Sequence, residues 1–219
     1  VPLVPPAFDF DAELLEEAFR QGAKALILCN PSNPCGKVFT YDELKIIADL
    51  AIKYDAYVIT DEVYEHIVYA PNKHIYMASL PGMRERTIVC NSLSKTYSIT
   101  GWRLGYVIAN PQVIDRVKKV HDFLTVGAAA PLMEAAVTGL KFGDDYYEGL
   151  AAHYTHMKEL FCSGLKNLGF TFTEPQGAYY VLMDVSEFGV KDDVKFCEWM
   201  TEHVGVAAVP GSSFFREDV

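Results

Sequence analysis

Apolar and polar positions along the chain predict strands and helices in alternation. Short, mainly apolar runs are typical of strands buried on both faces of a parallel sheet, and they occupy residues 25–29, 56–60, 87–90 and 106–109. Between them, apolar residues recur every three or four positions, which favours amphipathic helices. Asp11 is expected to cap one such helix, and Thr40 another that runs from Tyr41 to about Tyr54, with Glu43 completing a capping box.

The second half of the chain shows a different order of predicted elements. Helices are predicted from Asn110-Pro111 onward, at 129–141 and at 145–167, followed by short strands at 170–173, 178–183 and 206–209 and a helix at 194–203. We therefore expect an α/β fold in which a mainly parallel sheet forms the middle of three layers, joined to a small α+β unit. The expected division is residues 1–145 for the large portion and 146–219 for the small C-terminal portion.

Composition and charge narrow the function classes. With 219 residues, of which 50% are hydrophobic, the chain can bury a sizeable core, and its net charge of −10 argues against a nucleic-acid partner. Five scattered cysteines suit reduced thiols in the cytoplasm better than a disulfide framework, and no metal is assigned because neither cysteine nor histidine shows metal-ligand spacing. No apolar run reaches about 18 residues, so no membrane partner is expected.

A polar segment rich in hydroxyl groups, residues 92–106, lies between two of the apolar runs. Loops at strand ends are where functional sites collect. A lysine removed from water has a lowered pKa and can form a Schiff base, while serine hydroxyls and an arginine can hold a phosphate group. Lys95, Ser92 and Arg103 together therefore indicate a phosphorylated aldehyde, although an ordinary surface loop of this composition stays an alternative from this segment alone.

Two further segments follow predicted strands at their carboxyl ends, where open α/β sheets place ligands. In the turn 30–36, two Asn-Pro pairs restrict the backbone and leave the amide of Asn33 free to be aimed inward. Asp61 follows the next strand, and Tyr64 lies three residues further on. The carboxylate of Asp61 has two interpretations: an ordinary helix cap, or the partner of a protonated pyridine nitrogen.

These three segments, Asn-Pro-Ser-Asn-Pro-Cys-Gly at 30–36, Asp-Glu-Val-Tyr at 61–64 and Ser-Leu-Ser-Lys at 92–95 with its continuation to 106, carry a resemblance. In this order they resemble the motifs of the class I and II aminotransferases, which are fold-type I pyridoxal-phosphate enzymes. The resemblance covers the second half of that family's large domain and most of its small domain. Cys35 departs from the threonine that is usual at its position.

The resemblance implies that the cofactor is pyridoxal 5′-phosphate and that Lys95 holds it as a Schiff base and then shuttles the substrate proton. It also implies that Asn33 and Tyr64 contact the phenolic oxygen of the cofactor and that Asp61 contacts the pyridine nitrogen. The implied phosphate contacts are Ser92, Ser94 and Arg103. The implied reaction is transamination between an amino acid and a 2-oxo acid, of the aspartate, aromatic or kynurenine type, in a cytoplasmic homodimer.

Three alternatives to a transaminase stay open: a carbon-sulfur β-lyase of the same fold, the non-catalytic sensing domain of a regulator, and a structural relic. Members of the family are far longer, and the parts that would precede Val1 and follow Val219 carry the aromatic that stacks on the cofactor and the arginine that grips the substrate carboxylate. That arginine's role is not carried onto Arg216. We therefore expect the isolated chain to fold but not to be a competent transaminase.

Overall fold

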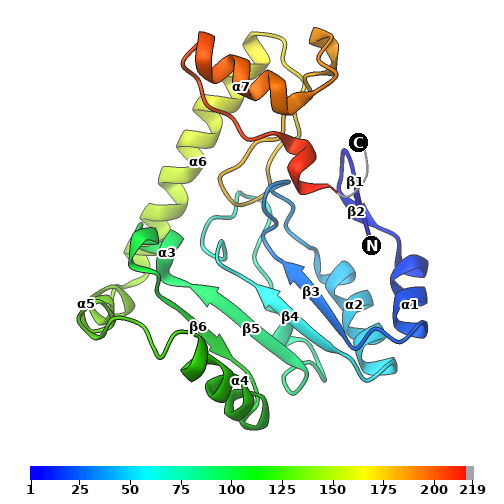
Figure 1. The fold of residues 1–219 in the computed structure, drawn as a ribbon, viewed down its shortest axis with the longest axis vertical. Coiled ribbons are helices and arrows are strands. Elements are labelled where there is room, and N and C mark those ends of the chain that lie inside the picture. The colour runs from blue at the N-terminus through cyan, green and yellow to red at the C-terminus, as the bar shows by residue number, and fades with distance from the viewer. Residues whose placement is uncertain (216–219) are drawn as a thin grey trace.

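The computed structural model describes residues 1–215, and a four-stranded sheet forms its centre (Figure 1). The strands lie in the order β3, β4, β5, β6, with bounds Ala25–Cys29, Tyr57–Asp61, Thr87–Ser92 and Gly105–Ile108. The first three are parallel to one another, and β6 is antiparallel to β5. The expected α/β fold with a mostly parallel sheet is therefore confirmed. The proline-rich start forms a small antiparallel ribbon of β1 and β2, Leu3–Val4 and Asp9–Phe10.

Seven α-helices and four 3₁₀ turns lie in the rest of the described chain, and several helices begin where the sequence predicts. The α-helices α1 to α7 are Ala12–Arg20, Tyr41–Lys53, Leu93–Thr96, Pro111–Leu124, Ala130–Leu140, Asp144–Asn167 and Asp193–His203. Short 3₁₀ turns η1 to η4 lie at Met77–Ser79, Thr100–Trp102, Ser186–Phe188 and Gly211–Phe214. Asp11 caps α1 by accepting from the backbone amides of the first turn, and the reciprocal capping box of Thr40 and Glu43 opens α2.

The main hydrophobic core lies between one face of the sheet and helices α1 and α2. Leu28 and Val58 point from β3 and β4 toward this core, where Leu44 and Ile47 of α2 are almost completely buried. Burying an aliphatic side chain of this size stabilises the folded state by about 1.5–3 kcal/mol. This packing holds β3 and β4 side by side, so their carboxyl ends open at one edge of the molecule.

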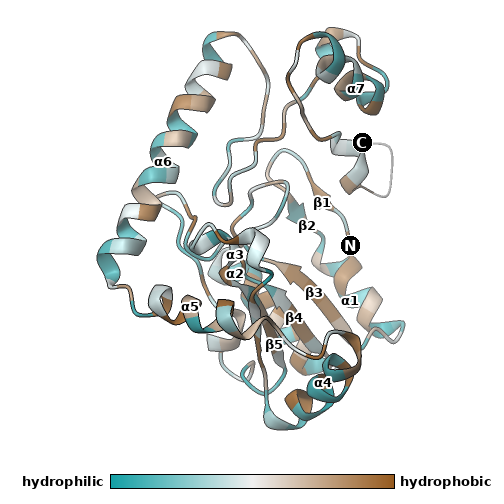
Figure 2. Ribbon diagram, turned by 60° about the vertical axis from the view of Figure 1, so that its left-hand side comes forward, coloured by the Kyte–Doolittle hydropathy of each residue, from teal (hydrophilic) through white to brown (hydrophobic). Residues whose placement is uncertain are grey.

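The opposite face of the sheet is only partly covered. Helix α4 lies over part of it and leaves a hollow of about 560 Å³ beside Tyr57 and Ile88, whereas Ile27 on β3 is 72% exposed. Figure 2 shows β3, β4 and β5 as apolar strands whose surface is not enclosed by helices on this side. A sheet face this apolar and this exposed favours association.

We expect the chain to self-associate through this face in a concentration-dependent way. Ile27→Lys should weaken the association by about 10-fold or more, because a charged side chain replaces an aliphatic one that would be buried. Sedimentation equilibrium measures the effect, and Ile46→Lys is the matched control because Ile46 is an exposed isoleucine on the outer side of α2. A chain that stays monomeric over the whole concentration range would contradict the expectation.

The C-terminal part extends away from the sheet along α6, and α7 lies at the far end of that helix (Figure 1). The helix predicted at 194–203 is confirmed by α7, but the predicted strands at 170–173, 178–183 and 206–209 are wrong within the described residues. Only a single bridge joins Phe172 to Met183. A strand needs a paired neighbour, and two short apolar segments alone do not supply enough pairing to form a sheet. The division near residue 145 stays a prediction.

Candidate active site

The candidate residues converge at the carboxyl edge of three neighbouring parallel strands. The turn after β3 carries Asn33, β4 ends at Asp61, and β5 ends at Ser92, which also caps the short helix α3 with Lys95 in its last turn. Cys29, Asp61 and Cys90 are register partners across these strands. Segments 30–36, 61–64 and 92–95, which are far apart in the sequence, are therefore brought to one edge, as the motifs predict.

The turn after β3 is held by its first asparagine. Asn30 is buried, and its side-chain oxygen accepts from the backbone amide of Phe39 at 3.1 Å. Inside the turn, the amide of Gly36 donates to the carbonyl of Ser32 at 2.9 Å. Asn33 is exposed in this turn. Its contact with a cofactor stays a prediction.

Asp61 combines features of both of its sequence interpretations. Its carboxylate accepts from the backbone amide of Val63 at 3.3 Å, which is a turn-capping bond, and the side chain is otherwise exposed at the end of β4. On the neighbouring strands, burial together with the negative charge of Asp61 raises the pKa of both Cys29 and Cys90. The two thiols therefore stay protonated near neutral pH and leave the carboxylate as the charged group among them.

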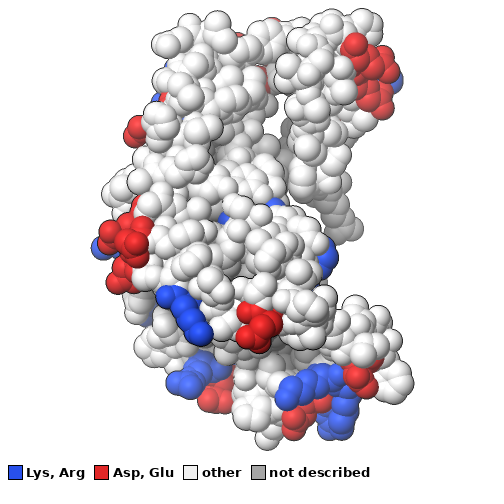
Figure 3. All heavy atoms as spheres, turned by 90° about the vertical axis from the view of Figure 1, so that its left-hand side faces the viewer, with Lys and Arg blue, Asp and Glu red and all other residues white. Residues whose placement is uncertain are grey.

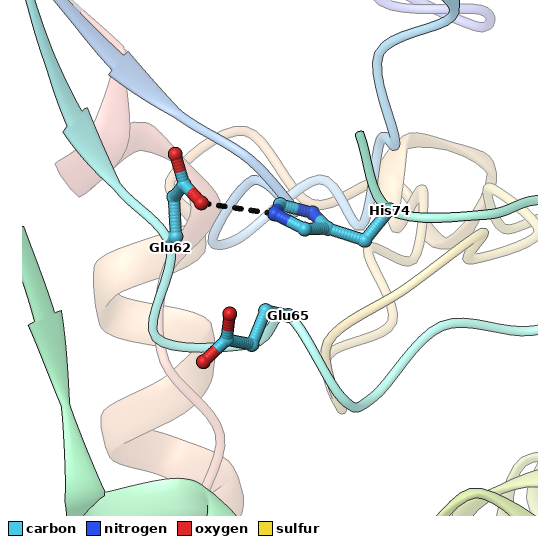
Figure 4. Close-up of side chains that lie close together, drawn as sticks. All are labelled: Glu62, Glu65 and His74. Atoms are coloured by element: carbon cyan, nitrogen blue, oxygen red, sulfur yellow. Dashed lines mark hydrogen bonds and ion pairs between the residues drawn. The ribbon is translucent and has the colours of Figure 1, made fainter. Parts of the chain in front are cut away.

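A buried polar pair supports the backbone directly behind Asp61. The Nε2 atom of His74 lies 3.0 Å from a carboxylate oxygen of Glu62, and both side chains are almost fully buried (Figure 4). Glu65 lies next to them and accepts from the amide of Asn91 at 2.7 Å. Ligand atoms of Glu62, Glu65 and His74 lie within 4.8 Å of one another, a spacing that a metal ion also uses. Each already has a protein partner, so we interpret the group as structural support for the end of β4.

Lys95 lies against two tyrosine rings. Its Nζ atom is 5.9 Å from the ring centroid of Tyr64 and 5.3 Å from that of Tyr179. Tyr64 is buried, and its hydroxyl donates to that of Tyr180 at 3.3 Å. The hydrogen bond with Tyr179 raises the pKa of Lys95, although burial acts in the opposite direction. The expected lowering of the lysine pKa is therefore wrong for the chain without a cofactor, because the half-buried amine gains more from its phenol partner than it loses by desolvation.

The residues expected to hold a phosphate lie beside Lys95 and interact with one another. The hydroxyl of Ser92 is 2.7 Å from that of Ser94 and 3.0 Å from the carbonyl oxygen of Leu104. Arg103 is exposed, has a left-handed backbone with φ of 56°, and donates to the carbonyl of Thr100 at 3.0 Å. These short-range bonds hold two hydroxyls and a guanidinium in one loop. Arg216 lies outside the described residues.

A hollow of about 360 Å³ opens around the lysine. Its walls come from α3, the loop after it, α6 and a C-terminal turn, and its lining residues are Ser94, Lys95, Ser98, Thr100, Tyr154 and Tyr179. The sequence interpretation missed Tyr154 and Tyr179 as neighbours of Lys95. The one sign of such a contact in the sequence is the pair of adjacent tyrosines at 179 and 180.

The turn that precedes Tyr179 is held by hydrogen bonds to the segments that follow β3 and β4. The backbone amides of Gln176 and Gly177 both donate to the carbonyl of Gly36 at 2.9 Å, and the hydroxyl of Tyr69 donates to the carbonyl of Ala178 at 2.6 Å. A bridge also joins Val68 to Gly177. The C-terminal part of the chain therefore closes one side of the site by fixed backbone contacts.

Residues 1–216 match the model of a family described as aminotransferase class I and II. The chain belongs to this family. It is 39% identical to kynurenine–oxoglutarate transaminase 3 of Homo sapiens over 95% of this chain and 49% of that protein. The solved structure of N-succinyldiaminopimelate aminotransferase from Mycobacterium tuberculosis is 35% identical, with a TM-score of 0.94 over 99% of this chain and 57% of that one. A methionine aminotransferase structure from Escherichia coli is 30% identical, with a TM-score of 0.92 over 99% and 57%.

This aminotransferase chain spans about half the length of the curated relatives that it matches. Charged side chains on the face drawn in Figure 3 form small separate groups of both signs. Among the described residues, no helix has both the length and the apolar character needed to span a membrane.

Gly177→Ala should destabilise this aminotransferase chain by about 1–3 kcal/mol, because the added methyl group meets a packed interior. A Cβ at this position would lie 2.8 Å from the Val38 side chain and 3.0 Å from the carbonyl of Ile67. Gly164→Ala, on the open surface of α6, is the matched control and should be neutral or slightly stabilising. Chemical denaturation measures both. Equal stabilities of the two variants would show that the turn at 177 is not packed as described.

Proposed function

We propose that the protein is a pyridoxal-phosphate-dependent aminotransferase that transfers an amino group between an amino acid and a 2-oxo acid. The observation that carries the proposal is the position of Lys95 on the hollow, at the same edge of the sheet as the carboxylate of Asp61 and the hydroxyls of Ser92 and Ser94. Family membership supports the same chemistry.

The chemistry of the donor set fits this cofactor. The amine suits an aldehyde, and the carboxylate suits a protonated pyridine nitrogen. The phenol and the amide suit a phenolic oxygen, and the loop of hydroxyls with a guanidinium suits a phosphate. Lys95 is the attachment residue in this proposal, and Asp61 holds the pyridine nitrogen protonated. Asn33 and Tyr64 are assigned to the phenolic oxygen. The phosphate is assigned to Ser92, Ser94 and Arg103.

When bound, pyridoxal phosphate supplies an electron sink for the negative charge that develops at the substrate α-carbon. The chain's own groups do the rest of the work. In this proposal the substrate amine would replace Lys95, and the freed amine of Lys95 would act as the general base that accepts the α-proton and as the general acid that returns it. The negative charge of Asp61 would favour a proton on the pyridine nitrogen, and the phenol of Tyr64 would donate to the phenolic oxygen.

The form of the protein in which this chemistry occurs is also a proposal. We assign residues 1–145 to the cofactor-binding portion and 146–219 to the small C-terminal portion, within a cytoplasmic homodimer. Since the relatives are about twice as long, we propose that residues outside these 219 supply the substrate-carboxylate arginine and the aromatic partner of the cofactor ring, and that the 219 residues alone lack competent turnover.

The names of the relatives leave the amino donor open, since they refer to kynurenine, N-succinyldiaminopimelate and methionine. The test is an assay of 2-oxo-acid formation by the full-length protein, with the 219-residue chain alongside, over a panel of amino acids and with and without an added 2-oxo-acid acceptor. A transaminase forms product only when the acceptor is present. Product formed equally without it, from sulfur-containing amino acids, would replace the proposal by a carbon-sulfur β-lyase.

A further inference from the structure

We propose that Tyr179 is a positioning residue for Lys95: its ring and hydroxyl hold the free lysine amine inside the site whenever that amine is not bonded to another group. The inference rests on the proposed function for its role in turnover. The lysine-phenol pair itself is a property of the chain without a cofactor.

The geometry around the amine supports the proposal. The rings of Tyr64 and Tyr179 are perpendicular, with centroids 5.2 Å apart, and the Nζ atom of Lys95 lies within 6 Å of both. A cation over two aromatic faces is stabilised by both of them. Tyr154 stacks on Tyr179 with an interplanar angle of 17°, and this contact restrains the orientation of the Tyr179 ring.

The hydroxyl of Tyr179 distinguishes it from its neighbour. The Nζ atom of Lys95 lies 5.3 Å from the ring centroid of Tyr179, and Tyr179 is the neighbour that raises the pKa of Lys95 most, whereas the hydroxyl of Tyr180 accepts from Tyr64. Burial raises the pKa of Tyr179, but the neighbouring Lys95, with Tyr64 and Tyr180, outweighs burial and holds that pKa below the ordinary value for tyrosine. The lysine pKa is raised and the tyrosine pKa is lowered, which are the directions expected of a cation beside a phenol.

The hydrogen bonds of the turn 176–178 explain how Tyr179, from the C-terminal part of the chain, is held beside Lys95. Gln176, Gly177 and Ala178 are bonded to the backbone around Gly36 and Ile67, so the next residue enters the site from a fixed point. In the catalytic cycle, Lys95 is free each time that the substrate amine replaces it. A phenol at this position keeps the released amine close to the reacting carbon and prevents it from swinging into the solvent.

The test measures the protonation of Lys95 in the 219-residue chain without any cofactor. Trace acetylation at a series of pH values, followed by peptide mass mapping, gives the apparent pKa of each lysine, with the exposed Lys118 of α4 as internal reference. Tyr179→Phe keeps the ring and removes only the hydroxyl. We expect the apparent pKa of Lys95 to fall, so that its labelling at pH 8 rises about threefold or more. Tyr180→Phe, the matched control, should change it less.

An unchanged Lys95 profile in folded Tyr179→Phe, checked by circular dichroism, would overturn the proposal. If that variant does not fold, Lys95→Met decides the question by ultraviolet titration of the tyrosines, because loss of the amine should move one phenol to higher pH. No shift in that titration would also overturn it. Because no cofactor is present, failure here leaves the assignment of Lys95 as the attachment residue standing. Failure of cofactor attachment would in turn leave the pair intact.

Discussion

Lys95→Ala should abolish covalent cofactor attachment and lower turnover of the active enzyme by about 10⁴-fold or more, because one change removes both the nucleophile and the general base. Lys95→Arg should be as inactive, although it keeps a cation between the rings of Tyr64 and Tyr179. A guanidinium stays charged at every accessible pH and cannot act as a nucleophile or base. Steady-state kinetics and the absorbance of the bound cofactor measure the two losses.

The arginine variant separates chemistry from packing. Lys118→Ala, on the exposed side of α4, is the matched lysine control and should keep full turnover. Thermal unfolding of Lys95→Arg should stay close to that of the parent chain, because the cation stays on its aromatic partners. Turnover of Lys95→Arg within tenfold of the parent would show that another group does the proton transfer.

Asp61→Ala should lower turnover by several powers of ten, since an uncharged neighbour no longer holds the pyridine nitrogen protonated and the electron sink is weakened. Asp61→Asn should have a similar effect while keeping an oxygen that accepts from the amide of Val63. The loss should fall mainly on kcat, because the charge is needed at the transition state more than for binding of the substrate.

The control for charge alone is Asp55→Asn at the amino end of β4, where the side chain is 95% exposed and pairs only with Arg86. This change should leave turnover intact and alter the free energy of unfolding by no more than about 0.5–1 kcal/mol. If Asp61→Asn retains near-parental kcat, the carboxylate is a turn cap and nothing more.

Much of the scaffold could be predicted because its signals are local. The apolar run 25–29 and the box formed by Thr40 and Glu43 specify a buried strand and a helix start within a few residues of sequence. Two parallel strands joined by a helix must end at the same edge, so the sequence alone places Asp61 and the turn at 30–36 at one edge of the sheet.

Other features depend on contacts between distant segments. Tyr179 reaches Lys95 only because the turn at 175–178 is bonded to the backbone near Gly36, and no periodicity encodes that meeting. The direction of the lysine pKa shift depends on the same contact, since burial alone would lower it. The apolar pattern of 170–173 and 178–183 predicts strands, but in the structure the pairing between these segments is limited to the bridge between Phe172 and Met183, which is too little to form a strand.

The most direct test of the account is borohydride reduction of the protein after incubation with pyridoxal phosphate, followed by peptide mass mapping. Reduction makes the lysine link permanent, so the modified residue can be read from the mass of its peptide. We predict the label on Lys95, with Lys95→Arg unlabelled and the buried Lys37, which is bonded to Asp9 and Glu43, unmodified. A label on another lysine while Lys95 stays unmodified would contradict the proposed site.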